Sequence, residues 1–152
     1  MVTHLAVRES VAAPPDQVMA ALTDYDRLPH WMLNVVGFEK LTEGPLGIGS
    51  RWKQLRMRFG EVASDLNEVV RLEPPRFFDV HIVSTRGTSV RADYLFRFVL
   101  EPEAGGTSLT VGLEGETTGV DYGPSPEMVA HAVAALVAAD LASLKRYVEG
   151  SA

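Results

Sequence analysis

Hydrophobic and polar residues alternate along much of the chain, a pattern that predicts β-strands. In residues 2–11, Leu5, Val7 and Val11 fall on one face of a strand. From residue 34 onward six more candidate strands follow, at 35–43, 50–59, 61–73, 76–84, 89–103 and 107–118. Glycine- and proline-rich turns separate these segments. Short segments joined by turns predict an antiparallel meander.

Two stretches after the first segment have helical periodicity. Pro15 suits a helix entrance, and Val18 and Leu22 recur four residues apart on one face, which predicts a short helix. Residues 25–32 predict a second short helix. Pro29 distorts it, because proline cannot donate a backbone hydrogen bond.

The strongest helical signal lies near the C-terminal end. Ser125 suits the N-cap and Pro126 the first helical position, and a helix of about 24 residues, roughly 36 Å long, follows. Its apolar surface is wide and comprises Val129, Val133, Leu136, Val137, Leu141, Leu144 and Val148. Such a helix must be covered on several sides, which a curved sheet wrapped around it would do.

Composition narrows the class of protein. A hydrophobic content of 46% and a charged content of 22% predict a folded chain, and 152 residues predict a single domain spanning 1–152. The net charge of -6 disfavours nucleic-acid binding, and the absence of cysteine removes thiolate chemistry. No leader or apolar run of membrane-spanning length is evident. We expect a cytoplasmic monomer or homodimer without membrane insertion.

Several phrases, in order, resemble one superfamily over nearly the whole chain. They are "VAAPPDQVMAALTDYDRLPHWM", "GIGSRW", "NEVVRLEPPRFF" and "FRFVLEPEAGGTSLT". Together they resemble the START/Bet v 1-like (SRPBCC) superfamily, in its polyketide cyclase/dehydrase-like branch. The resemblance implies an α+β helix-grip fold, in which a seven-stranded curved antiparallel sheet wraps a long C-terminal helix and two short helices follow the first strand. It implies a cavity and no cofactor, but it does not choose among the activities of carriers, receptors, cyclases and interaction modules.

Aromatic residues are the first candidates for the cavity wall. Trp31 and Trp52 offer flat apolar faces that suit planar ligands, although both are also typical core residues. Tyr94, Phe96 and Phe98 alternate along one segment and should point inward together. The Tyr94 phenol could orient a ligand carbonyl or act as a weak acid, or it could simply bond to the backbone.

The polar candidates for the cavity wall lie on the same face of the predicted strand as Trp52. Gln54 and Arg56 would give the cavity an amide and a cation able to hold a carboxylate or enolate. The next segment offers two possible neighbours, Asp65 and Asn67. The residues on the opposite face of this strand are apolar, which weakens the assignment of Gln54 and Arg56 to the cavity. Arg58 is expected on the surface.

Histidine positions give conflicting or negative signals. Apolar alternation turns His81 outward, whereas counting from the Pro74-Pro75 turn pairs it inward with Asp79 as an acid/base group; we favour the outward orientation. His4, His30 and His131 share no ligand spacing with it, so no metal site is expected.

Three functions remain open. The first is a protein that binds an apolar ligand, aromatic, polyketide-like or lipid, through Trp31, Trp52, Gln54, Tyr94, Phe96, Phe98, Val111, Ala132 and Leu136. The second is an aromatase/cyclase-type enzyme that uses Tyr94, Arg56 or His81 for proton transfer. The third is a co-chaperone-like interaction module, which requires an exposed apolar patch on the outer sheet face.

Overall fold

One curved sheet and three helices make up the part of the chain that the computed structural model describes, residues 3–58, 60–87, 90–119 and 126–150. The elements run in the order β1 (Thr3–Val11), α1 (Pro15–Leu22), the 3-10 helix η1 (Tyr25–His30), β2 (Val35–Lys40), β3 (Arg51–Arg58), β4 (Glu61–Glu73), β5 (Phe77–Arg86), β6 (Val90–Glu103), β7 (Gly106–Thr118) and α2 (Pro126–Gly150). The predicted second short helix is therefore a 3-10 helix, with Pro29 inside it. The predicted N-cap, Ser125, lies outside the described residues.

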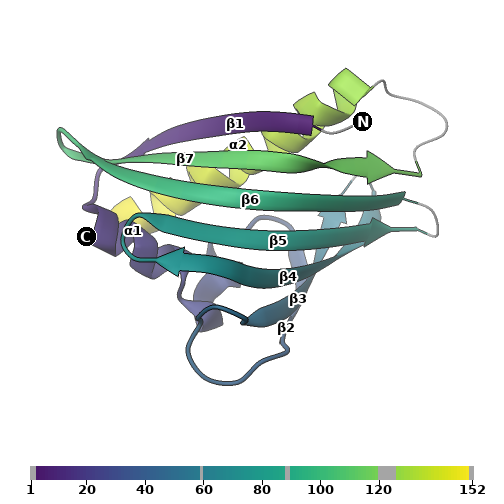
Figure 1. Cartoon of the computed structure of the whole chain (residues 1–152), viewed down its shortest axis with the longest axis horizontal. Helices are drawn as coiled ribbons and strands as arrows, with labels where there is room; N and C mark the ends of the chain where they lie inside the picture. The colour runs from purple at the N-terminus through teal and green to yellow at the C-terminus, as the bar shows by residue number, and fades with distance from the viewer. Residues whose placement is uncertain (1–2, 59, 88–89, 120–125, 151–152) are drawn as a thin grey trace.

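The seven strands form a single antiparallel sheet in the order β1-β7-β6-β5-β4-β3-β2. Strands β2 to β7 are a meander, and β1 joins its far edge by pairing with β7. Figure 1 shows the sheet in front of α2, with α1 and η1 on the same side of the sheet as that helix. The predicted helix-grip architecture is confirmed.

A close approach between β6 and β7 depends on glycine. A Cβ atom on Gly115 would lie 2.0 Å from the carbonyl oxygen of Asp93, so only glycine fits at this point of β7. Gly115 is directly opposite Tyr94 in the register. This crowding fixes the backbone on which Tyr94 is carried.

Helix α2 lies on the concave face of the sheet, where it packs mainly along β1. In its C-terminal half Leu141, Leu144 and Val148 are buried in the core. Its N-terminal half is looser, and Met128 is 61% exposed. Helix α2 is therefore more deeply buried in its C-terminal half than in its N-terminal half.

The apolar character of α2 corrects one expectation. The helix Glu127–Gly150 contains an 18-residue window with a mean hydropathy of 1.5 and is, by length and composition alone, apolar enough to cross a membrane, contrary to the prediction that no such run exists. In this fold the segment is the core helix that the sheet grips. Four of its apolar residues, Val137, Leu141, Leu144 and Val148, are buried in the hydrophobic core.

Candidate functional site

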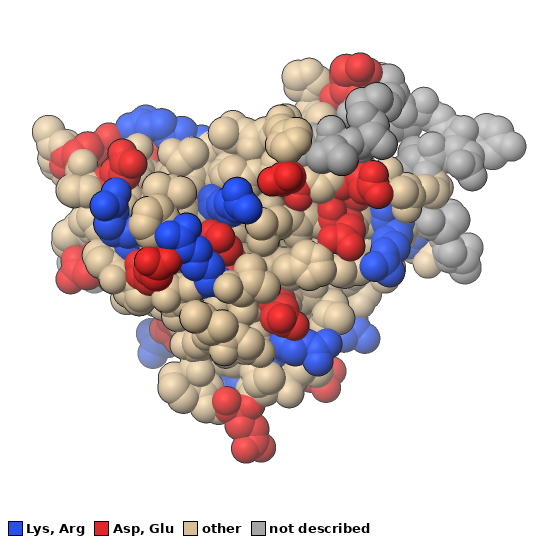
Figure 2. Space-filling view, in the orientation of Figure 1, with Lys and Arg blue, Asp and Glu red and all other residues tan. Residues whose placement is uncertain are grey.

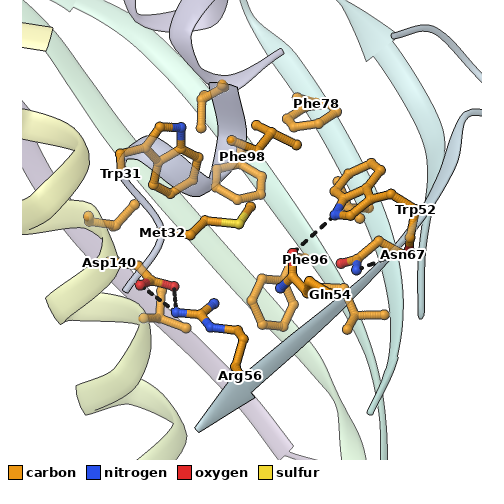
Figure 3. Close-up of a pocket in the computed structure, with 16 residues that line it drawn as sticks. Trp31, Met32, Trp52, Gln54, Arg56, Asn67, Phe78, Phe96, Phe98 and Asp140 are labelled. Atoms are coloured by element: carbon orange, nitrogen blue, oxygen red, sulfur yellow. Dashed lines mark hydrogen bonds and ion pairs between the residues drawn. The ribbon is translucent and has the colours of Figure 1, made fainter. Parts of the chain in front are cut away.

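A cavity with two adjoining lobes lies between the concave face of the sheet, η1 and α2. The inner lobe has a volume of about 60 Å³ and the outer lobe about 100 Å³. The inner lobe is lined largely by apolar side chains, whereas polar groups of β3, β4 and β5 reach the outer lobe. Figure 3 shows side chains of the inner lobe pointing toward one another from the sheet, η1 and α2.

Two tryptophans hold opposite sides of the inner lobe. Trp31 ends η1, and its indole N–H donates to the Ala21 carbonyl at 3.3 Å. Trp52 comes from β3 and packs edge-on against Tyr25, with ring centroids 5.7 Å apart. Both are almost fully buried and both line the lobe, so each is a core residue and a cavity residue at once.

The phenylalanines form the floor of the inner lobe. Phe78 of β5 and Phe98 of β6 have ring centroids 5.5 Å apart, and Phe96 extends the row toward the outer lobe. Aromatic alternation on β6 therefore faces the concave side, as its sequence predicts. The combined surface is aromatic and apolar, which suits an aromatic ligand.

Strand β3 places polar residues inside and apolar residues outside. Gln54 and Arg56 are buried and line both lobes. Met57, whose side chain points to the opposite face of β3, is 39% exposed. Arg58 also faces inward, with its side chain only 21% exposed, so the expectation of a surface arginine is wrong. The reason is that Asp65 on β4 provides an internal partner for it.

A hydrogen-bonded chain connects the polar side chains of β3 and β4. The Trp52 indole donates to Gln54 Oε1 at 3.1 Å, and Gln54 Nε2 donates to Asp65 Oδ2 at 3.2 Å. Arg58 donates to both oxygens of the Asp65 carboxylate, at 3.1 and 2.9 Å. Each member orients the next, so the polar wall is rigid and largely self-satisfied.

The second ion pair joins the sheet to α2. Nη2 of Arg56 donates to the two oxygens of Asp140 at 2.7 and 2.8 Å. The backbone of Leu33 serves both partners, because its carbonyl accepts from Arg56 Nε and its N–H donates to Asp140, each at 3.1 Å. The sequence predicted that Arg56 could hold a ligand carboxylate; in the structure the carboxylate is the protein's own.

Asp140 lines both lobes and was not among the residues predicted for the cavity. It is the only acidic residue between Glu127 and Glu149, and all its neighbours from Ala132 to Ala142 are apolar. A lone carboxylate in such a stretch signals an internal partner, because an unpaired buried charge is costly. That signal does not identify the partner, which lies 84 residues earlier.

The outer lobe contains the Tyr94 phenol. Its hydroxyl hydrogen-bonds with Thr117 Oγ1 at 3.0 Å, and its ring packs edge-on against Phe96. Leu136 of α2 covers the same lobe. Tyr94 thus has a side-chain partner instead of a backbone one.

His81 belongs to the opposite face of the sheet. Its Nε2 lies 2.7 Å from Asp93 Oδ1, and the side chain is about half exposed. Asp79, also on the outer face, lies near Arg97, and burial raises the pKa of its carboxyl above the usual value. The inward Asp79–His81 acid/base pair is therefore not formed, and His81 has no place in the cavity.

Two of the proposed ligand-binding residues line neither lobe. Val111 is fully buried on β7, between Val7 and Phe98 in the register, where the sheet is packed without an adjoining cavity. Ala132 is half-buried on α2 but contributes to neither lining. The other seven line the cavity: Trp31, Trp52, Gln54, Tyr94, Phe96, Phe98 and Leu136. Within the described ranges, no three His, Asp or Glu side chains form a group that could hold a metal ion.

Comparison with known proteins gives a family and a set of fold neighbours. A family model described as "Polyketide cyclase / dehydrase and lipid transport" matches residues 3–149. No curated protein matches. The solved structure of Ara h 8.0201 has a TM-score of 0.77 at 19% identity and covers 99% of both chains. A conserved protein from Geobacillus kaustophilus has a TM-score of 0.81 at 14% identity, covering 99% of this chain and 97% of that one.

A further neighbour is described by its biosynthetic locus. DynU16, from the dynemicin biosynthetic locus, has a TM-score of 0.64 at 24% identity. The match covers 96% of this chain but 47% of that one. At these identities the solved structures show a shared fold only.

Proposed function

Because the chain belongs to the polyketide cyclase/dehydrase and lipid-transport family, which supports hydrophobic-ligand binding in general, we propose that its cavity holds a flat aromatic or polyketide-like small molecule. The observation that carries this proposal is the aromatic lining of the inner lobe by Trp31, Trp52 and Phe98, continuous with an outer lobe that polar groups of β3, β4 and β5 also reach. An aliphatic lipid would need apolar walls but gains nothing from flat rings or from the buried hydrogen-bonded chain.

The size of the cavity fits this class. Each lobe is smaller than the roughly 150 Å³ of an engineered apolar cavity that binds benzene. The two lobes together reach that size. A bicyclic ring system therefore needs both lobes, or a small outward movement of α2.

A titration with 2-naphthol tests the proposal. Binding should quench tryptophan fluorescence, because Trp31 and Trp52 line the inner lobe. The variant Ile82→Phe fills the junction of the lobes and should weaken binding at least about tenfold. Its matched control is Val83→Phe, on the opposite face of β5, which should bind like the wild type. Equal loss in both variants, or no binding by any of them, would refute the cavity as the site.

One observation favours a second candidate, a cyclase-type enzyme. The outer lobe brings the Tyr94 hydroxyl near a fixed wall containing Arg58, Asp65 and Ser84. A polyketone folded against this wall could receive a proton from Tyr94 on the oxygen of the carbonyl under attack. Turnover of a polyketone surrogate that is lost in Tyr94→Phe, with binding retained, would establish this function. Turnover that survives the change would exclude Tyr94 as the acid.

The remaining expectations stay predictions. These are a single domain over residues 1–152, a cytoplasmic location, a monomer or homodimer, and partners that include neither nucleic acid nor a membrane. The co-chaperone-like alternative requires an exposed apolar patch on the outer sheet face. Met57 and Val62, paired on β3 and β4, are exposed there, but acidic and basic side chains are interspersed over the face in Figure 2. Ion pairs such as Arg8–Glu103 and His81–Asp93 lie on this outer face.

A further inference from the structure

The charged groups facing the cavity balance one another. Among the described residues, four charged side chains line the two lobes: Arg56, Arg58, Asp65 and Asp140. They form two closed pairs, Arg56 with Asp140 and Arg58 with Asp65. In both pairs the guanidinium contacts both oxygens of the carboxylate. The cavity wall therefore carries no net charge.

The Arg56–Asp140 pair stands where the lobes meet. Six residues line both lobes, namely Gln54, Arg56, Ile82, Phe96, Val137 and Asp140. Arg56 reaches across from β3 to α2 at this point, as Figure 3 shows. A ligand that occupies both lobes must lie directly against the pair.

Two polar side-chain atoms at the inner lobe have unused hydrogen-bonding capacity. The Asn67 amide nitrogen donates to the backbone carbonyls of Trp52 and Asp65, which fixes the direction of the amide. Its Oδ1 has no partner among the described residues and remains an acceptor. Nη1 of Arg56 likewise has no hydrogen-bond partner in the described part of the chain and remains a donor. One acceptor and one donor match a ligand that carries a hydroxyl or amide beside a carbonyl.

We propose, building on the proposed function, that the cavity selects neutral aromatic ligands with a donor and an acceptor over aromatic carboxylates, and that Asp140 sets this preference. A carboxylate entering the cavity loses its hydration and finds both guanidinium groups already neutralised. It can accept a hydrogen bond from Arg56 Nη1, but no uncompensated positive charge is left to pair with it unless it displaces Asp140 from Arg56. A neutral amide or phenol meets neither cost.

Two ligands of the same shape isolate charge from size. 2-Naphthamide and 2-naphthoate are isosteric, and only the second is ionised at pH 7. Binding of each is measured by calorimetry on the intact protein, and the readout is the ratio of the two Kd values. For the wild type we expect 2-naphthamide to bind at least about tenfold more tightly.

Two variants should move the ratio in opposite directions. Asp140→Asn keeps the acceptor for the Leu33 N–H but releases the charge of Arg56, so the preference for the amide should fall about tenfold or reverse. Arg56→Gln leaves Asp140 as an unpaired anion and should raise the preference. If Asp140→Asn does not fold, the ratio of the two Kd values in Arg56→Gln tests the inference on its own.

A surface variant controls for overall charge. Asp26→Asn also raises the net charge by one and also breaks an ion pair with an N···O distance of 2.7 Å, to Lys40, but its side chain is 77% exposed. It should leave the Kd ratio unchanged. A wild type that binds 2-naphthoate as tightly as the amide, or a ratio that Asp26→Asn shifts as much as Asp140→Asn, would overturn the inference. If the inference fails in this way but 2-naphthol still binds, the proposed function stands. If 2-naphthol, 2-naphthamide and 2-naphthoate all fail to bind, the inference and the proposed function are both overturned.

Discussion

At the scale of single residues, Trp52 shows how one side chain can serve both core and cavity. Its indole is 2% exposed, packs on Tyr25 and begins the hydrogen-bonded chain through Gln54. Sequence parity could place Trp52, Gln54 and Arg56 on one face of β3. It could not decide that this face is internal, because Leu55 and Met57 on the other face are more apolar. Only the partners Asp65 and Asp140, supplied by other elements, make the polar face the buried one.

The dual role of Trp52 predicts a large stability effect. We expect Trp52→Ala to lower the free energy of unfolding by about 3–5 kcal/mol, the usual cost of emptying a large aromatic site in a core. Urea denaturation measures this. The control Met57→Ala, on the exposed face of the same strand, should cost less than about 0.5 kcal/mol. A small effect of Trp52→Ala would mean that the surrounding side chains close over the gap. Binding studies should therefore use Trp52→Phe, which keeps most of the packing.

Asp79 leads to a pH prediction on the outer face. Burial raises the pKa of its carboxyl in the folded protein, so the folded state holds the proton more tightly than the unfolded chain does. Stability from this group is therefore greatest below the unfolded pKa and falls as pH rises through the folded pKa. Asp79→Asn should have the same Tm as the wild type near pH 3 and a higher Tm than the wild type toward pH 7. A variant that becomes less stable than the wild type toward neutral pH would show that the ion pair with Arg97 dominates instead.

At the scale of elements, the strand positions and the two α-helices were predictable, whereas the 3-10 form of η1 was not. The predicted segment 61–73 coincides with β4, and 107–118 begins one residue after the start of β7, because turns and alternation mark strand ends well. The segment 76–84 stops two residues before the end of β5 at Arg86, where Ser84, Thr85 and Arg86 break the apolar pattern. The stretch around Pro29 became a 3-10 helix, since proline removes the N–H that an α-helix would use.

The last turns of α2 are fastened to the junction of β1 and α1 by charged side chains. Glu149 accepts from the Ala12 N–H at 2.8 Å and from Lys145 at 2.7 Å, and Lys145 also donates to the Ser10 carbonyl. These bonds, the one from Ala12 first, lower the pKa of the Glu149 carboxyl. The stabilisation is therefore present above the unfolded pKa and is lost as pH falls through the folded pKa.

Removing the charge of Glu149 should consequently matter only when that group is ionised. Glu149→Gln is expected to lower Tm at pH 7 and to leave it unchanged at an acidic pH below the folded pKa, where the wild-type carboxyl is protonated as well. Thermal unfolding followed by circular dichroism at the two pH values measures the difference. An equal loss of stability at both would mean that shape, and not charge, holds the junction together.

At the scale of the whole molecule, the cavity lies between the concave face of the sheet, η1 and α2. The sequence predicts the wide apolar face of α2 and hence a sheet that grips it. How much space remains between sheet and helix depends on how far the sheet curls, which the pattern of hydrophobic residues does not specify. Ala135 and Ala139 of α2 are exposed, on a side of the helix that the sheet does not cover.

The uneven burial of α2 predicts unequal stability along the helix. Residues 141–149 include Leu141, Leu144 and Val148, all buried, whereas residues 129–140 rest over the cavity with few buried contacts. Backbone amides of 129–140 should therefore exchange with deuterium faster than those of 141–149, because local opening there exposes less apolar surface. Asp140→Asn should speed exchange in 129–140 only, since Arg56 then holds the helix less tightly. Filling the cavity with 2-naphthol should slow exchange in that same half. Uniform protection along α2, unaffected by the substitution or the ligand, would mean that the helix moves as one unit and that ligands enter by another route.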